Sequence, residues 1–323
     1  MARVIDVDVQ RFAPSPLHAP DRNWYEGNCY TDLWIAVLHC LGLEPRACLG
    51  PTLSCGYSAD QWTFFKPSPG DLQRLYGVVT EELTVWRSLL AHCEAHVAAG
   101  QLPLVEVDAF YLPDTAQTDY QKNHSKTTIA VNAVDAQTKT LEYFHNAGYF
   151  ALTGNDFDGI FRLSKNASEG HLPPYCETVK LAHLVSRPDG ELKKLARNMA
   201  TEHIRSRPLD NPIAAFEQSL EQALPQLIEQ DEDFFHAWVF ASLRQLGAGF
   251  ELAAIHLRWL AHDQDAVIDE AAQHFDAIAD TAKMLVMKTA RIAMSGKTKS
   301  LAEPLAQMQA DLEAAYALLD RQL

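Results

Sequence analysis

The sequence lacks the features that mark several large classes of protein. No apolar run approaches the roughly 18 residues that a membrane-spanning helix needs, and no basic segment followed by an apolar one stands at the amino terminus. We therefore expect a cytoplasmic protein without membrane contact. Basic residues are too few to balance the acidic ones, 27 against 42, which gives a net charge of −15. Such a surface repels phosphate backbones, so nucleic acid is not an expected partner.

Cysteine is also scarce. Six cysteines in 323 residues do not make the framework of a small disulfide-stapled protein, and in a reducing compartment we expect free thiols. The sequence has no glycine-rich phosphate-binding loop, so bound nucleotide has no support. His92 and His96 have a helical spacing compatible with zinc, but no obvious third ligand accompanies them. We predict no metal and no cofactor bound by this chain.

The character of the sequence changes near residue 180. Most glycines, prolines and aromatic residues precede that point, whereas Ala, Leu, Glu and Gln dominate after it. This division predicts an α+β domain over residues 1–179 and an α-helical domain over residues 180–323. The expected helices of the second domain cover about residues 189–206, 212–229, 232–246, 249–262, 264–294 and 301–321.

Two helices, a strand and a hairpin are expected in the first domain. One helix begins at about Cys29 and ends at Leu41, and the other covers roughly residues 69–99, with a break at Gly77 left open. Residues 105–112 alternate and predict a strand. Residues 127–134 and 141–146 are β-rich runs on either side of a polar turn, which favours an antiparallel hairpin.

Cys29 stands where a loop with Gly and Asn enters an apolar helix. The positive end of a helix dipole and its unpaired N–H groups favour a thiolate at such a position, and a thiolate is the better nucleophile. Six residues upstream, the amide of Asn23 is a candidate donor to the oxyanion of a tetrahedral intermediate. The other five cysteines have no comparable setting. The alternative is that Cys29 is one more small buried residue.

A cysteine nucleophile needs a base, and His124 precedes the first strand of the expected hairpin. The two strand ends should meet, which brings His145 or Asn146 close to His124 or to the residues just after it. An amide or carboxylate there would orient the imidazole. The candidate catalytic residues are therefore Cys29, His124 and Asn146, with His145 and Asp135 as alternatives for the orienting residue.

This order of residues resembles the papain-like cysteine fold. The layout is similar to that of the double-glycine-type peptidases that process bacteriocins. The segment Asp-Ala-Phe-Tyr-Leu-Pro at 108–113 resembles the N-terminal domain of butirosin biosynthesis protein H, an acyltransferase. The segment Tyr-Phe-His-Asn-Ala-Gly-Tyr at 143–149 resembles an uncharacterised bacterial family associated with gene clusters for amino-acid activation onto carrier proteins. The resemblance covers about residues 20–165 and implies a papain-like catalytic domain with an antiparallel sheet.

The resemblance implies an acyltransferase that depends on a cysteine. Cys29 would take an acyl or aminoacyl group from a carrier-protein thioester, with His124 as general base and acid, and pass it to a small-molecule acceptor. The phosphopantetheine would belong to the carrier protein. Two alternatives stay open: a cysteine peptidase or amidase with the same residues, and a non-catalytic binding protein on a papain-like core.

One basic stretch interrupts the acidic sequence. Between residues 283 and 299 there are five basic residues and no acidic one. Carrier proteins are commonly acidic, so we expect this stretch to be their docking patch. Solvated helix faces and cations near a helix end are the alternative explanation. The five residues are Lys283, Lys288, Arg291, Lys297 and Lys299.

Overall fold

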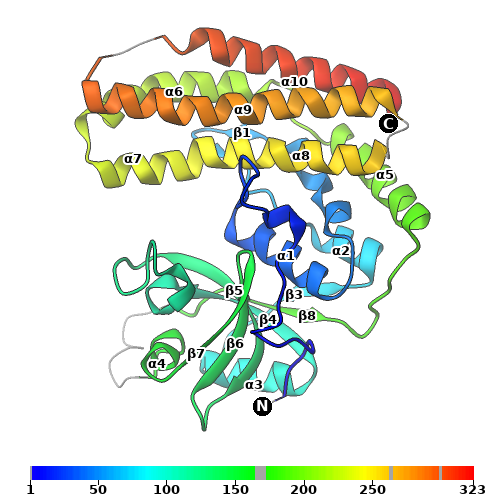
Figure 1. Ribbon diagram of the computed structural model, residues 1–323, viewed down its shortest axis with the longest axis vertical. Coiled ribbons are helices and arrows are strands. Elements are labelled where there is room, and N and C mark those ends of the chain that lie inside the picture. The colour runs from blue at the N-terminus through cyan, green and yellow to red at the C-terminus, as the bar shows by residue number, and fades with distance from the viewer. Residues whose placement is uncertain (1, 164–171, 262–264, 298–299) are drawn as a thin grey trace. The chain divides into compact units, whose positions relative to one another are not determined.

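The computed structural model describes residues 2–163, 172–261, 265–297 and 300–323 (Figure 1). The fold is α+β, with an antiparallel sheet and a helical carboxy-terminal region, which confirms the predicted α+β class. The chain divides into two compact units. The first comprises Met1–Ala19, Asn28–Pro45 and Pro69–Arg187, and the second comprises Pro20–Gly27, Arg46–Ser68 and Pro188–Leu323.

This division differs from the linear one at residue 180 that the sequence suggests. Two segments of the amino-terminal half, Pro20–Gly27 and Arg46–Ser68, belong to the helical unit. The indole of Trp24 is buried there and donates a hydrogen bond to the carbonyl of Ala279 at 3.0 Å. Composition shows where helices dominate, but it does not show which distant segment completes their core.

The first unit is built on a six-stranded sheet in the order β3-β8-β4-β5-β6-β7, with every neighbouring pair antiparallel. The strands are β3 (Val79–Glu82), β4 (Gln101–Asp108), β5 (Lys126–Asp135), β6 (Thr140–His145), β7 (Gly148–Thr153) and β8 (Cys176–Lys180). The helices are α1 (Cys29–Cys40), α2 (Pro69–Tyr76), α3 (Leu89–Ala98) and α4 (Asn155–Ile160). The predicted hairpin is confirmed by the pairing of β5 with β6.

The two faces of this sheet are distinct. Side chains alternate along a strand, so Val105 and its partner Ile129 share one face. Both belong to an apolar core that includes Cys93 of α3 and Phe157 of α4, and we call this side the α3 face. The residues that alternate with them along each strand face the other way. Helix α1 packs against β5, β6 and β7.

Helix α1 lies on the opposite side, which we call the α1 face. The hydroxyl of Tyr30 donates to Oε2 of Glu177 at 2.6 Å. Glu177 pairs with Leu104, and Leu104 pairs with Ala130. These positions alternate with the residues of the α3 face, so the sheet lies between α1 and the core under α3 and α4.

The expected helix over residues 69–99 is two helices with a strand between them. Gly77 has φ +70°, and a Cβ there would clash with the carbonyl oxygen of His183. Only glycine accepts both conditions, so α2 ends and the chain continues into β3, which pairs with β8. The short, half-exposed strand gives little periodic signal, because its burial does not alternate.

The second unit is mainly helical. Its small hairpin consists of β1 (Tyr57–Ser58) and β2 (Gln61–Trp62). Its helices are α5 (Asp189–Arg205), α6 (Pro212–Glu229), α7 (Glu232–Val239), α8 (Gln245–Ala261), α9 (Ala266–Ser295) and α10 (Ala302–Gln322). Within the described residues, no helix combines the length and the apolar character that crossing a membrane requires.

The predicted helix boundary between residues 246 and 249 is wrong. Helix α7, a π-helical segment at Phe240–Arg244 and α8 follow one another without a loop. Gly247 and Gly249 lie inside α8, where a Cβ at Gly247 would clash with the Trp24 ring and one at Gly249 would lie 3.2 Å from Phe65. These glycines permit close packing of side chains on the helix and do not end it.

Candidate functional site

Cys29 is the first residue of α1. The side chain of Asn28 caps the helix by accepting a hydrogen bond from the N–H of Thr31 at 2.9 Å. The helix is buried from Tyr30 to Leu38, whereas Cys29 is half-buried. Cys29 is the first helical residue, so the positive end of the helix dipole lies at this thiol. Among the described residues, the thiol makes no hydrogen bond.

Glu177 fixes the start of α1 to the sheet. Its two carboxylate oxygens accept hydrogen bonds from Tyr30 at 2.6 Å and from Tyr175 at 2.5 Å. Burial and the carboxylate of Glu177 raise the pKa of Tyr30 above its ordinary value, so the hydroxyl stays a donor. Because Tyr30 follows Cys29 directly, these contacts hold the cysteine end of α1 over β8 and β4.

His124 and Asp108 form a hydrogen-bonded pair. Nδ1 of His124 lies 2.6 Å from Oδ2 of Asp108. Asp108 is four residues from Leu104 along β4, and therefore lies on the α1 face. With Nδ1–H donated to the carboxylate, Nε2 is the free proton acceptor. The side chain of His124 is 68 % exposed, so this nitrogen is accessible to a substrate.

Phe110 supports the same imidazole. Its ring stacks on His124 with centroids 4.4 Å apart and planes 12° apart. Its N–H donates to Oδ1 of Asp108 at 3.0 Å, and its carbonyl accepts from the N–H of Gln121 at 3.0 Å. One carboxylate therefore holds both the imidazole and the backbone of the residue stacked on it.

A second histidine–aspartate pair lies on the α3 face. Nδ1 of His145 is 2.5 Å from Oδ2 of Asp114, and the hydroxyl of Tyr143 donates to Oδ1 of Asp114 at 2.5 Å. Nε2 of His145 lies 2.8 Å from Oγ1 of Thr127, so the hairpin does bring His145 to a residue just after His124, as expected. Because Tyr143 belongs to the core under α3 and α4, the sheet separates His145 from α1.

Asp114 anchors the loop that leads to His124. Its side chain is 6 % exposed and that of His145 is 1 % exposed. Burial and the charge of Asp114 raise the pKa of Tyr143 above its ordinary value, so the phenol remains a hydrogen-bond donor. A second tether joins the hydroxyl of Tyr120 to Oδ2 of Asp156 at 2.9 Å. The loop is thus held from the α3 face, while His124 at its end meets the α1 face.

The other candidates for the orienting residue occupy turns. Asn146 has φ 46° between β6 and β7. Asp135 accepts hydrogen bonds from the N–H groups of Thr138 and Gln137 at 3.2 and 2.8 Å, and these bonds lower its pKa. Within the described chain, neither residue is hydrogen-bonded to His124. The side chain hydrogen-bonded to the imidazole is that of Asp108 and none of the three that the sequence suggested.

Asn23 belongs to the second unit. Its side-chain amide donates to Oδ1 of Asp280 at 2.8 Å, and its N–H donates to Oε1 of Glu251 at 3.1 Å. Its carbonyl accepts from Nζ of Lys283 at 3.1 Å. The amide that the sequence suggested as an oxyanion donor is therefore committed to a carboxylate.

The basic residues of the stretch 283–299 differ in their contacts. Lys283 lies 4.4 Å from the centre of the Trp24 ring and is half of a cation–π pair. Lys288 and Arg291 lie on α9 and make no ion pair with any residue that the structure describes. Lys299 lies outside the described residues. Lys297 follows α9 and likewise makes no ion pair in the described chain, so the free cations of this stretch are Lys288, Arg291 and Lys297.

Four of the other cysteines are thiols whose pKa is raised by burial. Burial raises the pKa of Cys55 to about 12 and that of Cys176 to about 11. It also raises the pKa of Cys40 and of Cys93 above the ordinary value. Thiols of this kind stay protonated at neutral pH and are poor nucleophiles, which makes them internal controls for the reactivity of Cys29.

The residues that sequence reasoning missed are Asp108 and His18. The strand expected over 105–112 is β4, which ends at Asp108. The Asp108 side chain caps the N–H of Phe110 and starts a 3-10 turn, and an Asp at the end of a strand is a signal for such a turn. His18 is buried, with Nε2 3.5 Å from Oδ1 of Asp32, one helical turn after Cys29. Nothing in the local sequence marks that contact.

The two helical histidines do not form a metal site. Nε2 of His92 accepts from the backbone N–H groups of Trp86 and Arg87 at 3.3 Å, and Nδ1 of His96 lies 2.8 Å from Oε1 of Gln101. No group of three or more His, Cys, Asp or Glu side chains that could hold a metal ion occurs in the described part of the chain.

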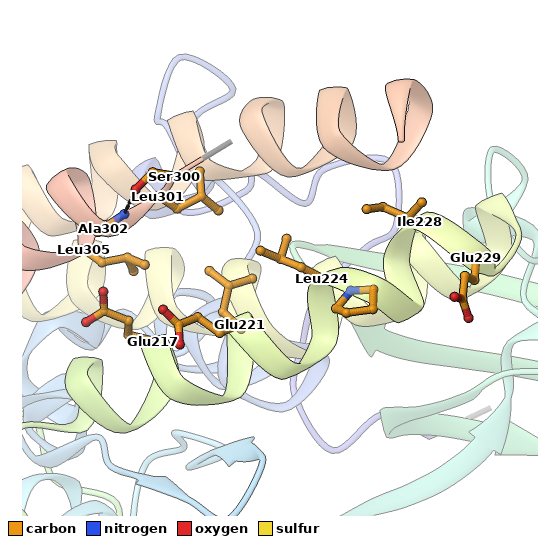
Figure 2. Close-up of a pocket in the computed structure, with 11 residues that line it drawn as sticks. Glu217, Glu221, Leu224, Ile228, Glu229, Ser300, Leu301, Ala302 and Leu305 are labelled. Atoms are coloured by element: carbon orange, nitrogen blue, oxygen red, sulfur yellow. Dashed lines mark hydrogen bonds between the residues drawn. The ribbon is translucent and has the colours of Figure 1, made fainter. Parts of the chain in front are cut away.

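A groove of about 490 Å³ lies on the second unit, between α6 and the start of α10. Figure 2 shows Leu224 and Ile228 projecting from α6 toward Leu301 and Leu305. The groove contains none of the residues that the sequence suggested as a site. It is therefore a second, separate candidate for binding.

Comparison with known families accounts for nearly the whole chain. The model of the DUF1839 N-terminal domain matches residues 13–181, and that of the DUF1839 C-terminal domain matches residues 189–321. A search of curated proteins finds no match. The chain belongs to the DUF1839 family, and the boundary between the two matched domains falls between β8 and α5.

Proposed function

We propose that this member of the DUF1839 family transfers an acyl or aminoacyl group through a thioester on Cys29, on a papain-like arrangement of helix and sheet. His124 is the general base and acid, and Asp108 orients its imidazole. The donor is the phosphopantetheine thioester of a carrier protein, and the acceptor is a small amine or alcohol.

The observation that carries the proposal is the shared face. Cys29 starts the helix that packs on the α1 face, and the His124–Asp108 pair stands on that same face. His124 has the open Nε2 that a base needs, whereas His145 is enclosed on the α3 face. A thiol at a helix start and an imidazole fixed by a carboxylate are the parts that nucleophilic catalysis by cysteine requires.

In the first half-reaction, the sulfur of Cys29 bonds to the acyl carbon of the donor. His124 takes the thiol proton at Nε2, and the bond from the acyl carbon to the pantetheine sulfur breaks. That sulfur leaves with the proton from His124. Thioester is exchanged for thioester, so the step is close to balanced in energy and needs no cofactor on this chain.

In the second half-reaction, the acceptor nitrogen or oxygen bonds to the same carbon. Its proton passes to Nε2 of His124, the bond to the Cys29 sulfur breaks, and the proton returns to that sulfur. The oxyanion of each tetrahedral intermediate needs donors. Because Asn23 is bonded to Asp280, we assign this task to the backbone N–H of Cys29, the first residue of α1.

The test is selective alkylation of the native protein with limiting iodoacetamide from about pH 5.5 to 8.5, where an ordinary thiol with a pKa of about 8.5 reacts slowly. Peptide mapping then gives the rate for each of the six cysteines. We expect Cys29 alone to react fast at low pH and His124→Ala to abolish that reactivity. His183→Ala is the control, because His183 is exposed and its side chain makes no hydrogen bond or ion pair in the described chain.

A second measurement separates transfer from the alternatives. Incubation with an acyl-pantetheine thioester should add the acyl mass to the wild type and not to Cys29→Ser. If the acyl-enzyme decays at the same rate with and without amine acceptors, the protein is a hydrolase. If Cys29 reacts no faster than the buried cysteines and forms no acyl-enzyme, the catalytic proposal fails and a binding role on the same core replaces it.

Carrier docking is the remaining part of the proposal. Lys288 and Arg291 have no ion-pair partner in the described chain, so an acidic carrier protein can pair with them. We expect Lys288→Glu together with Arg291→Glu to raise KM for a carrier-bound thioester and to leave the reaction of a free acyl-pantetheine unchanged. Lys194→Glu is the control, because Lys194 is an exposed position of α5 outside the stretch. Equal effects on both donors would remove the docking assignment.

A further inference from the structure

The groove of the second unit has an apolar floor. Four leucines line it, and each is at most 9 % exposed: Leu220, Leu224, Leu301 and Leu305. Figure 2 shows the side chains of α6 and those at the start of α10 facing one another across it. An apolar cleft of about 490 Å³ falls in the range that binds ligands or side chains of a partner.

The rim of the groove is acidic. Glu221 and Glu229 line it, are exposed, and make no hydrogen bond or ion pair within the described residues. Glu217 also lines it, but its Oε2 accepts from Nε2 of Gln309 at 2.7 Å. No Lys or Arg is among the lining residues. The carboxylates of Glu221 and Glu229 are therefore available to pair with cationic groups of a bound partner.

Pro225 adds a third polar group. It lies inside α6 and lines the groove. Proline has no N–H, so the carbonyl of the residue four positions earlier loses its helical donor. That residue is Glu221, so its backbone carbonyl lacks the usual helical donor. The other side chains of α6 that line the groove are those of leucine, isoleucine and glutamate.

We propose that this groove binds a basic amphipathic helix of a partner protein. The occupant needs apolar side chains for the leucine floor, and it needs cationic donors for Glu221, Glu229 and the freed carbonyl. A helix laid in a groove supplies both from one face. The inference is independent of the Cys29 chemistry, since all lining residues belong to the second unit.

The spacing of the glutamates defines the expected pattern. Glu221 and Glu229 are eight residues apart on one helix, which corresponds to about 12 Å along its axis. Two cations eight residues apart on a partner helix match that distance. Leucines at three, four and seven positions after the first cation would then fall between the two carboxylates and over the floor.

The probe is a synthetic 15-residue helical peptide with that pattern, fluorescein-labelled and titrated with the full-length protein at low salt. The comparison peptide carries Glu in place of the two cations and is otherwise identical. We expect binding of the basic peptide only, weakened by salt. The double variant Glu221→Lys with Glu229→Lys should weaken binding about tenfold or more. Ile228→Asn should also weaken binding, because it puts a polar side chain in the apolar lining of the groove.

The chain is acidic overall, so a matched control is needed. Glu94→Lys with Glu270→Lys changes the net charge equally at exposed positions outside the groove, and should leave the affinity unchanged. If both double variants weaken binding equally, or the basic peptide does not bind, the inference is overturned. A concentration-dependent dimer that Glu221→Lys with Glu229→Lys dissociates would also overturn it, since a second copy would then cover the groove.

Discussion

The two histidine–aspartate pairs of the first unit have the same chemical parts and opposite environments. His145 and Asp114 are enclosed on the α3 face, where Tyr143 and Thr127 complete their hydrogen bonds. His124 is open to solvent, and one ring nitrogen has no partner in the described chain. A fully bonded pair can hold a structure together, but it has no free nitrogen with which to take a proton.

The difference lies in the strand periodicity. Asp108 and Asp114 are six residues apart, but the chain leaves β4 at Asp108 and crosses to the α3 face before Asp114. This segment therefore contributes Asp108 to the α1 face and Asp114 to the α3 face. We regard the α3-face pair as the anchor of the loop and the α1-face pair as the reactive one, and each of the following experiments tests that division.

The largest effect is expected on stability, from the enclosed pair. Asp114→Ala leaves a buried imidazole and a buried phenol without their acceptor, and removal of one partner from such a site costs about 3–5 kcal/mol. Asp108→Ala, at a 31 % exposed carboxylate, should cost about 1 kcal/mol. Urea unfolding of both variants measures the difference. Equal losses would mean that the two pairs are not functionally divided.

The next effect is on reactivity, and it should have the reverse order. Asp108→Asn removes the acceptor that orients His124 and should slow the low-pH alkylation of Cys29 by about tenfold, less than His124→Ala does. Asp114→Asn, assayed well below its unfolding midpoint, should leave the rate within about twofold. A greater loss in Asp114→Asn than in Asp108→Asn would reverse the assignment of the two faces.

A smaller effect is expected from two tyrosines with carboxylate partners on opposite faces. Tyr143→Phe removes a hydrogen bond to Asp114, and Tyr149→Phe removes one to Glu142, each at a cost of about 1–2 kcal/mol. Only Tyr143 is connected to the loop that carries His124. We therefore expect both variants to lose stability and only Tyr143→Phe to alter proteolysis of the loop 109–125. Equal protection of the loop in both would contradict the anchoring role.

The smallest effect concerns Glu142, a partly buried carboxylate of the α1 face. Burial raises its pKa, but hydrogen bonds from Arg3 and Tyr149 outweigh burial, and the pKa lies below the ordinary 4.5. A lowered folded pKa stabilises the protein above the unfolded pKa, and this contribution is lost as the pH falls through the folded value. Wild type should exceed Glu142→Gln in urea midpoint at neutral pH, and the difference should shrink as the pH falls below the ordinary pKa and through the lower folded value. A constant gap would exclude this linkage.

Local sequence predicted the elements whose signals are local. The change in composition near residue 180 separates the sheet from most of the helices, and the polar turn after residue 134 fixes the hairpin. The start of α1 follows from its cap, Asn28. The glycines misled because their role is tertiary: Gly247 lies in mid-helix to admit the Trp24 ring. The strand β3 was missed because it is short and half-exposed.

The candidate site divides in the same way. Cys29 at a helix start and His124 before a strand are visible in the sequence, since each depends on its neighbours in the chain. The partner of His124 is not visible in the sequence, which suggested Asn146, His145 or Asp135. The structure shows Asp108 instead, because a single residue of register moves a side chain to the other face of a sheet.

The sequence by itself determined the α+β class, the hairpin, the position of Cys29 at a helix start and the excess of negative charge. The tertiary structure decided which histidine is open and which is enclosed, which aspartate each one contacts, and that Asn23 is bonded to Asp280. The physical reason is range. Caps, turns and alternation act over a few residues, whereas burial and face are settled only when strands far apart in the chain pair and helices cover them.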